Sequence, residues 1–307
     1  MGSAVGPSEG YAEIGVIGGT GFYRMEGLSD VRELHVDTPF GAPSSAVTVG
    51  TLHGRRVAFI SRHGEEHRIL PSELPARANV LALKALGVRQ VLTVSAVGSL
   101  REEVAPLHAV VPDQLIDRTR GRAGTFFGEG LVAHVGFADP FDETLREALA
   151  AGAEAAGATT HRGGTLVVME GPAFSTRAEA QLYRSWGASA IGMTALPEAK
   201  LAREAELCYA SLCLVTDYDV WHETEEDVSS ALILENLRRN TEHAKAAVSG
   251  VIASLSRELP ACECRDALGG ALITPRELVP METRRRLRLL LDRYWGGEMG
   301  VAVEGAS

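Results

Sequence analysis

The feature that most constrains the fold is a regular alternation of short β-branched segments with longer segments of helical periodicity, which runs from residue 14 to about residue 259. This alternation is typical of a mostly parallel sheet covered by helices. We expect strands at 14–17, 46–52, 57–61, 90–94, 110–112, 164–169, 188–193 and 208–216. We expect helices at 72–86, 142–156, 177–186, 196–206 and 225–255. A short gap between the strands 46–52 and 57–61 predicts a hairpin, and therefore a mixed sheet.

The composition changes after residue 259, where Pro260 and a C-x-C pair interrupt the helical pattern. We therefore predict a flexible N-terminus at 1–12, an α/β domain at 13–259 and a C-terminal extension at 260–307. The extension carries an amphipathic segment, 276–295, in which arginines lie among leucines. That pattern favours a peripheral or subunit-contact helix with a solvated basic face over a DNA-binding helix.

The cysteines fall into two pairs. Cys208 and Cys213 lie in an apolar, strand-like segment and are expected to be inert core residues. Cys262 and Cys264 lack the spacing of common zinc knuckles and of C-x-x-C redox sites. A reducing cytosol would disfavour a permanent disulfide between them.

The charge balance limits the partners that this chain can have. Lys and Arg number 30 and Asp and Glu number 40, so the net charge is −10. Such a chain has no general attraction for nucleic acid or an anionic membrane, and an anionic ligand must be held by a few local groups. No apolar stretch approaches the roughly 20 residues of a membrane span, and residues 1–10 do not resemble a secretory signal. We therefore expect a cytoplasmic protein that binds small molecules.

Small and polar residues follow several of the expected strands. They are the glycine-rich stretch 18–21 with Thr20, the pair Arg62 and His63, the stretch 95–99 that begins with Ser95, and Thr194. Backbone N–H groups, hydroxyls and a planar guanidinium are donors that suit a phosphate. Ligand groups in α/β folds cluster at the carboxyl ends of strands. Each motif alone also fits an ordinary turn or a surface ion pair, but together they predict a phosphate pocket.

Two carboxylates, Asp217 and Asp219, end the long apolar strand 208–216. In an extended backbone, residues i and i+2 point the same way, so this pair could bind neighbouring polar groups of a flat heterocycle. A turn or capping role and a metal site remain open, although no D-x-D-x-D-G loop or His pair accompanies them. Phe174, in a Gly/Pro loop, suits stacking on a base, with a core position as the alternative.

Several motifs, in this order, resemble the trimeric purine nucleoside phosphorylase family, and within it the 5′-methylthioadenosine phosphorylase branch. They are 17–21 (IGGTG), 62–64 (RHG), 96–103 (AVGSLREE), 170–172 (EGP), 193–194 (MT), 197–198 (PE) and 216–219 (TDYD). The resemblance runs from about residue 13 to residue 255. It implies a single α/β domain on a mixed sheet, a homotrimer that could pair into a hexamer, and no metal or organic cofactor.

The resemblance also implies a reaction. Phosphate, as co-substrate, replaces adenine at the ribose C1′ of 5′-methylthioadenosine, which makes the chain a pentosyltransferase of purine and methionine salvage. A related 5′-deoxy-5′-substituted adenosine, such as a 5′-halogenated one, would react in the same way to give the 5-substituted ribose-1-phosphate. The transition state resembles an oxocarbenium ion, so a carboxyl that holds a proton at purine N7 would assist the departing base.

Site residues are carried over from the same motifs. The phosphate-binding positions are Thr20, Arg62, His63, Ser95, Ala96 and Thr194. The resemblance implies that Asp217 holds the proton at N7, Asp219 selects the 6-amino group, Phe174 stacks on the base, Ser175 lies beside it and Met193 lies beneath the ribose. It implies that the neighbouring subunit lends His134 to the 5′ pocket and that Ile233 lies near that pocket.

Two other functions remain open at this point. Gly192 before Met193 is similar to branch members that take 6-oxopurine nucleosides such as inosine and guanosine. We favour 6-aminopurines, because a carboxylate at Asp219 would be repelled by a 6-oxo group unless it were protonated. The second alternative is a non-catalytic nucleoside-binding module, since a fold does not establish an activity.

Overall fold

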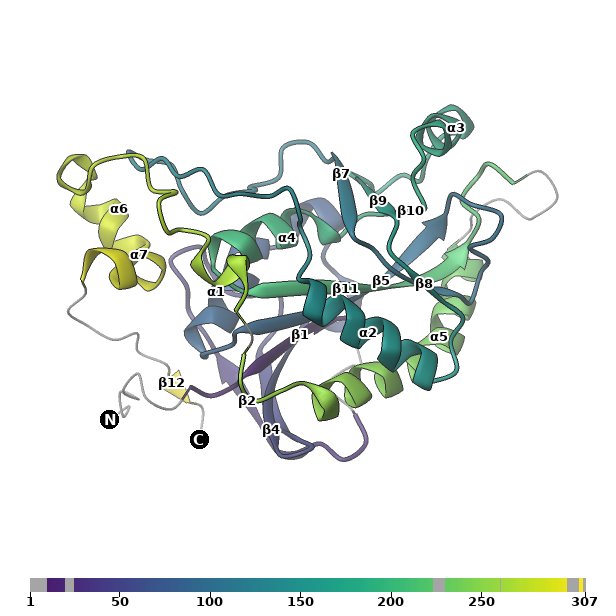
Figure 1. The fold of residues 1–307 in the computed structure, drawn as a ribbon, viewed down its shortest axis with the longest axis horizontal. Helices are drawn as coiled ribbons and strands as arrows, with labels where there is room; N and C mark the ends of the chain where they lie inside the picture. Colours follow the sequence, from purple (N-terminus) through teal and green to yellow (C-terminus); the bar gives the residue numbers. More distant parts are fainter. Residues whose placement is uncertain (1–9, 20–24, 223–229, 260, 297–303, 306–307) are drawn as a thin grey trace.

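The computed structural model describes residues 10–19, 25–222, 230–259, 261–296 and 304–305, and for 230–235 and 237–239 the backbone alone. Its centre is a 12-stranded mixed sheet with helices on both faces (Figure 1). The mixed α/β class expected from the sequence is confirmed. None of the described helices is long and apolar enough to cross a membrane.

The strands that the sequence predicts all form. The full set is β1 (Ile14–Gly18), β2 (Ser29–His35), β3 (Val47–Leu52), β4 (Arg55–Ser61), β5 (Gln90–Ser99), β6 (Ala109–Val111), β7 (Gln114–Arg118), β8 (Thr160–Arg162), β9 (Thr165–Met169), β10 (Ala190–Gly192), β11 (Cys208–Asp217) and β12 (Glu304–Gly305). The order is β12-β2-β3-β4-β1-β5-β10-β9-β7, and β11, β6 and β8 branch from β5. The hairpin of β3 and β4 is antiparallel, as predicted. The sequence analysis missed β2 because its side chains are exposed except for Leu34, so it lacks an apolar pattern.

Strand β5 is the hub of the sheet. It pairs in parallel with β1 and β11 and antiparallel with β10. Its first residues lie beside β1, and its last residues, Gly98 and Ser99, lie beside β10. The sequence predicted a strand that ends at residue 94, whereas β5 runs to Ser99. The extra residues carry polar and small side chains into the ordered sheet.

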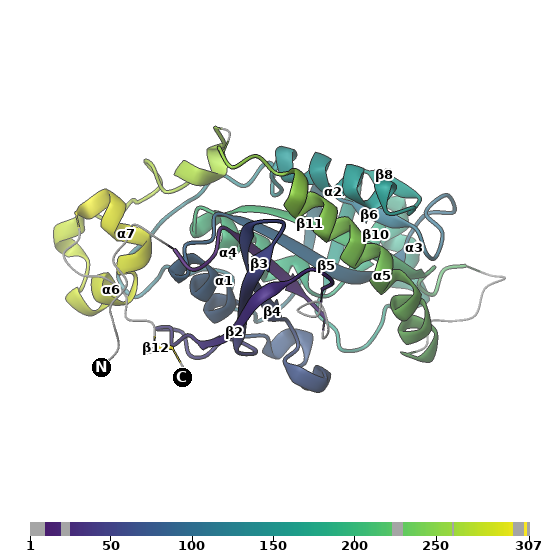
Figure 2. The ribbon, with the colours of Figure 1, turned by 90° about the horizontal axis from the view of Figure 1, so that it is seen from below.

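The helices cover the sheet in two layers (Figures 1 and 2). On one face lie α1 (Ala76–Ala85) and α4 (Ala195–Glu204), and on the other lie α2 (Glu143–Ala155) and α5 (Ser230–Ser254). Helix α3 (Arg177–Ser185) projects at one end of the molecule. Local capping explains two of the starts: Asp142 accepts from the backbone N–H of Leu145, and Thr176 forms a capping box with Glu179.

The C-terminal extension differs from its prediction. The single helix expected at 276–295 is wrong: the segment forms the 3-10 turn η4 (Arg276–Leu278), then α6 (Met281–Arg286) and α7 (Arg288–Trp295). Pro280 starts α6, and Leu287 departs from helical geometry between the two helices. The break lets Leu287 bury itself with the core, where it is 1% exposed. The division of the chain at residue 259 stays a prediction.

The cysteines are a second difference. Cys208 and Cys213 are buried, as expected. Cys262 and Cys264, at the start of the 3-10 turn η3 (Glu263–Asp266), are joined by a disulfide, contrary to expectation. The local backbone brings their Cα atoms to 5.4 Å, within the usual disulfide range.

We expect Gly152 of α2 to be required for close packing on α5. A Cβ at this position would lie 2.8 Å from the Ala247 carbonyl oxygen and from Cγ2 of Val251. Gly152→Ala should therefore lower the free energy of unfolding by about 1–3 kcal/mol, although alanine is the better helix former. Gly250→Ala, in α5 with open space around its Cβ, is the control and should raise it by about 0.5–1 kcal/mol. Urea unfolding measures both, and a stabilised Gly152→Ala would contradict this packing.

Candidate active site

The carboxyl ends of β1, β4, β5 and β11 meet at one edge of the sheet. The strands are parallel, with Gly18 of β1 opposite Ser61 of β4 and Ser95 of β5 opposite Cys213 of β11. Strand β10 enters from the other direction and ends beside β5, so the residues after it reach the same edge. Polar residues that are far apart in the sequence are thereby collected in one place.

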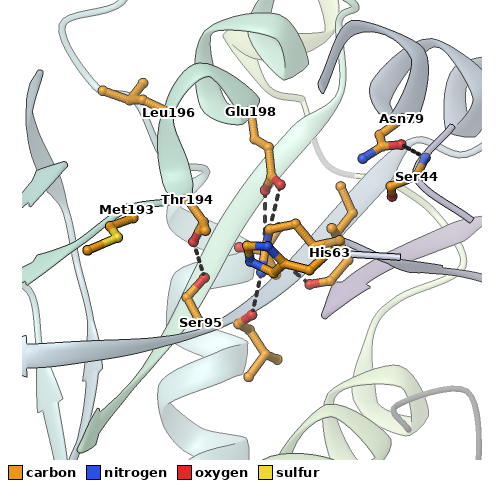
Figure 3. Close-up of polar contacts among 12 residues, drawn as sticks. Ser44, His63, Asn79, Ser95, Met193, Thr194, Leu196 and Glu198 are labelled. Atoms are coloured by element: carbon orange, nitrogen blue, oxygen red, sulfur yellow. Dashed lines mark hydrogen bonds and ion pairs between the residues drawn. The ribbon is translucent and has the colours of Figure 1, made fainter. Parts of the chain in front are cut away.

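Arg62 follows β4 and is buried, with 2% of its surface exposed. Its Nε and Nη2 atoms donate to the carboxylate of Glu198 at 2.6 and 3.1 Å, and its Nη1 atom donates to the carbonyl oxygen of Val94 at 2.8 Å. The sequence analysis expected the planar edge of the Arg62 guanidinium to bind an anionic ligand. In the structure this edge contacts Glu198, a residue of α4 (Figure 3). Sequence reasoning did not assign Glu198 to the site.

A buried network surrounds this ion pair. The Tyr209 hydroxyl lies 3.2 Å from Glu198 and 3.3 Å from the Thr93 hydroxyl. Burial alone lowers the pKa of Arg62, but the charge of Glu198 and its hydrogen bond raise it by more, so Arg62 stays charged. The Arg62–Glu198 ion pair is therefore held rigidly, and its net charge is close to zero.

His63 contacts the backbone rather than a carboxylate. Its Nδ1 atom lies 2.8 Å from the carbonyl oxygen of Ile69, and its ring stacks on His67 with centroids 4.2 Å apart. Burial lowers the pKa of His63 to about 4, so the ring is neutral at pH 7. Because a carbonyl only accepts, Nδ1 carries the hydrogen and Nε2 is an acceptor. Nε2 would suit a protonated oxygen of a phosphate rather than a bare one.

The hydroxyls of Ser95 and Thr194 face each other at 3.0 Å (Figure 3). Ser95 lies on β5, and Thr194 directly precedes Ala195, where α4 begins. Ala96 follows Ser95 on the same strand. Thr20, predicted to join this group, lies outside the described residues.

Asp217 and Asp219 lie at the end of β11. The Asp217 carboxylate accepts from the Thr216 hydroxyl at 2.7 Å and from the backbone N–H of Asp219 at 2.8 Å. The condition of an extended backbone is not met at Asp219, which has φ of +53°. Both carboxyls are buried.

The two carboxyls are biased toward their protonated forms. Burial raises the pKa of Asp217. Burial also raises the pKa of Asp219 to about 6, the charge of Asp217 acts in the same direction, and a hydrogen bond from Ser175 opposes them. One Asp219 oxygen, Oδ2, is buried with no partner among the described residues. An unpaired buried acceptor of this kind is suited to a donor on a ligand.

The loop after β9 carries two further predicted site residues, Phe174 and Ser175. Ser175 is buried, while Phe174 beside it has 42% of its surface exposed, so the core position considered for Phe174 is excluded. Gly171, in the same loop, is so close to Met193 that a Cβ there would lie 2.5 Å from the methionine sulfur. The loop therefore packs directly on the Met193 side chain.

Strand β5 sets the distance between the hydroxyl cluster of Ser95 and Thr194 and the carboxyl pair of Asp217 and Asp219. Ser95 contacts Thr194, and a Cβ on Gly98 would lie 2.9 Å from Oδ1 of Asp217. Three residues of extended strand span roughly 10 Å, which is the scale of a ribose with its two substituents. The hydroxyl cluster and the Asp217 carboxyl thus lie at the two ends of one short stretch of β5.

Two predicted residues lie apart from this grouping or cannot be placed. His134 is exposed in the loop after Leu131, where its N–H bonds to the carbonyl oxygen of Ala271. It does not join the other residues within one chain. Ile233 falls in α5, where the structure describes only the backbone.

Arg122 is a residue that sequence reasoning missed. Its side chain is 4% exposed and bonds to Glu170 at 3.1 Å. Its guanidinium also donates to the carbonyl oxygens of Met193 and Leu196 at 2.6 and 2.8 Å, and to that of Glu170 at 2.5 Å. A lone arginine in a loop carries no motif, so only the fold reveals that it joins the loop after β9 to the end of β10.

A model of the phosphorylase superfamily matches residues 13–253. This chain belongs to that superfamily. An S-methyl-5′-thioadenosine phosphorylase from Geobacter sulfurreducens is 54% identical over 92% of this chain and 98% of the relative. A methylthioadenosine phosphorylase from an antarctic soil metagenomic library has a TM-score of 0.88 and 46% identity, covering 92% and 100% of the two chains. The family resemblance seen in the sequence is confirmed.

A second similar structure contains a nucleoside. A variant of the adenosine/methylthioadenosine phosphorylase of Schistosoma mansoni, in complex with methylthioadenosine, has a TM-score of 0.74 and 36% identity to this phosphorylase. It covers 79% of this chain and 91% of the other.

We predict that Asp219 makes the stability of this phosphorylase fall as pH rises. Its pKa is about 6 when folded, against an ordinary value of 3.8. Between these values the folded protein keeps a proton that the unfolded chain has lost, so stability declines through this window and the loss is complete above it. The loss attributable to Asp219 is at most about 2–3 kcal/mol.

Urea unfolding across this pH range, on the wild type and two variants, tests the prediction. Asp219→Asn should remove much of the decline, with Asp217 accounting for the remainder. Ser175→Ala should extend the decline to higher pH, because the Ser175 hydrogen bond lowers the pKa of Asp219. A wild-type slope in Asp219→Asn would show that this carboxyl ionises freely.

Proposed function

We propose that this phosphorylase cleaves S-methyl-5′-thioadenosine with inorganic phosphate to give adenine and 5-methylthioribose-1-phosphate. The observation that carries the proposal is the placement of donor groups and protonatable carboxyls at the two ends of one short stretch of β5, from Ser95 to Gly98. Phosphorolysis needs a nucleophilic anion on one side of C1′ and help for the departing base on the other. The names of the relatives favour the methylthio substrate.

Phosphate would be positioned by the hydroxyls of Ser95 and Thr194, the backbone around Ala96, and His63 as acceptor. Thr20 is assigned here from the sequence alone. Arg62 supplies fixed positive charge, moderated by Glu198. Such groups stabilise the ribosyl cation indirectly, because they hold the phosphate beside it in a preorganised site.

Asp217 would assist the departing base. A protonated carboxyl can hold a hydrogen at purine N7 and neutralise the charge that develops there as the C1′–N9 bond breaks. The burial that raises the pKa of Asp217 favours that protonated state. General acid assistance of this kind is typically worth about 10²–10⁴ in rate.

Asp219 would select the purine. Its unpartnered Oδ2 atom can accept from a 6-amino group, whereas a 6-oxo group offers no hydrogen. Leaving a buried acceptor unpaired costs about 1–3 kcal/mol, which disfavours inosine and guanosine. Phe174, exposed and adjacent to Ser175, would stack on the base plane.

The 5′ pocket would be completed by a second copy of the chain. His134 is exposed on its own protomer, so a neighbouring subunit could receive it beside Ile233. This arrangement requires the homotrimer expected from the sequence. A 5′-halogenated adenosine would use the same site and differ only in that pocket. We propose a cytoplasmic enzyme with inorganic phosphate as co-substrate and no cofactor.

Arg122 would act as a positioning residue. It joins the carbonyl oxygens of Met193 and Leu196 to that of Glu170, in the loop that carries Phe174. A shift in this link would move the ribose and base contacts without touching the phosphate donors on β5. Its contribution should therefore show in nucleoside binding rather than in phosphate binding.

We predict that Arg122→Met raises the KM for nucleoside roughly 10- to 100-fold, since it leaves buried carbonyl oxygens unpaired. The KM for phosphate should change little. Arg122→Lys should restore part of the loss, because an ammonium keeps the charge but not the fork. Arg120→Met, at an exposed neighbour, is the control. Equal changes in both KM values would show a general structural defect instead.

Base selection can be measured with a kinetic panel. The wild type should release adenine from S-methyl-5′-thioadenosine, and hypoxanthine from inosine much more slowly, only when phosphate is present. Asp219→Asn should narrow this preference by about 10- to 100-fold or invert it, because an amide can donate to a 6-oxo group. Glu147→Gln, exposed on α2, is the matched control.

The panel also distinguishes the alternatives. Faster turnover of inosine by the wild type would make the chain a 6-oxopurine phosphorylase. Nucleoside binding without phosphate-dependent turnover would make it a binding module. A faster reaction with a 5′-halogenated adenosine would keep the mechanism and change the substrate.

A further inference from the structure

Three sulfur atoms and a carboxylate gather at the end of β11 that lies away from the candidate active site. Cys208 begins β11, Asp142 caps α2, and Cys262 and Cys264 flank the start of η3. Nine residues of extended strand separate Cys208 from Asp217, which corresponds to roughly 30 Å. The proposed phosphorolysis therefore makes no use of this group.

The ligand atoms of these residues all lie within 4.8 Å of one another. Asp142 Oδ2 is 2.9 Å from Cys262 Sγ and 3.5 Å from Cys264 Sγ, and Cys208 Sγ is 3.1 Å from Cys264 Sγ. In a tetrahedral zinc site with Zn–S bonds of about 2.3 Å, neighbouring sulfurs lie roughly 3.8 Å apart. Small adjustments of these side chains would thus place four ligands around one ion.

The surroundings suit such a site. Cys208 and Cys264 are both 4% exposed, so the sulfurs are shielded from water. Asp142 accepts from the Leu145 N–H with Oδ1, which orients Oδ2 toward the sulfurs. The positive charges of Arg265 and Arg203 act on Cys208 and would offset the excess negative charge of the ligands.

We propose that the reduced protein binds one Zn²⁺ ion through the Sγ atoms of Cys208, Cys262 and Cys264 and the Oδ2 atom of Asp142. A dithiol or phosphine reductant first supplies two electrons to the Cys262–Cys264 disulfide, which takes up two protons and opens to two thiols. Zn²⁺ then displaces the protons of three thiols to solvent. Thiolate ligands select zinc over hard cations, and a closed set of four protein ligands is typical of a structural site.

The site would tie the C-terminal extension to the core. Cys262 and Cys264 belong to the extension, whereas Cys208 and Asp142 belong to β11 and α2. Zn²⁺ binds the thiolate form of each cysteine, so the three thiols lose their protons as the ion binds. Metal binding should therefore release protons and stabilise the extension.

Cobalt spectroscopy tests the proposal on the full-length protein. After anaerobic reduction with a phosphine, Co²⁺ should give thiolate-to-cobalt charge-transfer bands and the intense visible bands of a tetrahedral ion, saturating at one equivalent and abolished by Zn²⁺. Cys262→Ser, at a half-buried position, should weaken Zn²⁺ affinity at least about tenfold, as should Asp142→Asn. Cys213→Ser, a buried cysteine on the same strand, is the matched control and should bind normally.

The wild-type spectrum is measured independently of the variants, so a variant that fails to fold does not weaken the test. Reduced wild-type protein without tetrahedral bands would overturn the proposal. Bands that persist unchanged in Cys262→Ser would also overturn it. Because the readout is optical, its result is independent of whether the chain cleaves a nucleoside.

Discussion

The arrangement of the site depends on a single strand, β5, which pairs with β1, β10 and β11 at once. A strand with three partners cannot shift its register without disturbing each of them. Its last residues are therefore held rigidly, and Ser95 and Gly98 keep a constant separation. The chemistry proposed here needs that constancy, since a displacement of about 1 Å can cost two orders of magnitude in rate.

Burial of charge is the second constraint on this edge of the sheet. Moving an ion out of water costs several kcal/mol, so Arg62 is held against Glu198, and the pair contacts Tyr209. Among the described residues no cation is paired with the carboxyls of Asp217 and Asp219, and burial raises the pKa of each. One edge of the sheet thus holds a buried, charge-compensated Arg62–Glu198 pair and two carboxyls whose pKa values are raised.

Sequence reasoning reached the fold class, and it identified polar strand ends that the structure brings to one edge of the sheet, because both rest on local patterns. Strand ends are marked by glycines and hydroxyls, and the resemblance carried residues such as Thr194 and Asp217. The sequence analysis did not assign Glu198 and Arg122 to the site, because both act through contacts with residues distant in the sequence. Glu198 contacts Arg62, and Arg122 contacts the carbonyl oxygen of Met193. The sequence analysis did not predict the break between α6 and α7 at Leu287, because burial of this leucine outweighs the helical periodicity of the segment.

Two close contacts of glycines explain why motifs alone could not predict the geometry of the site. Gly98 lies against Asp217, and Gly171 lies against Met193, each at a distance that no Cβ could share. These contacts bring the carboxyl pair toward β5 and the loop after β9 over the end of β10. A motif shows that a glycine is present, but only the folded structure shows which side chain packs against that glycine. The spacing of the site is therefore set by the absence of two methyl groups as much as by the polar residues.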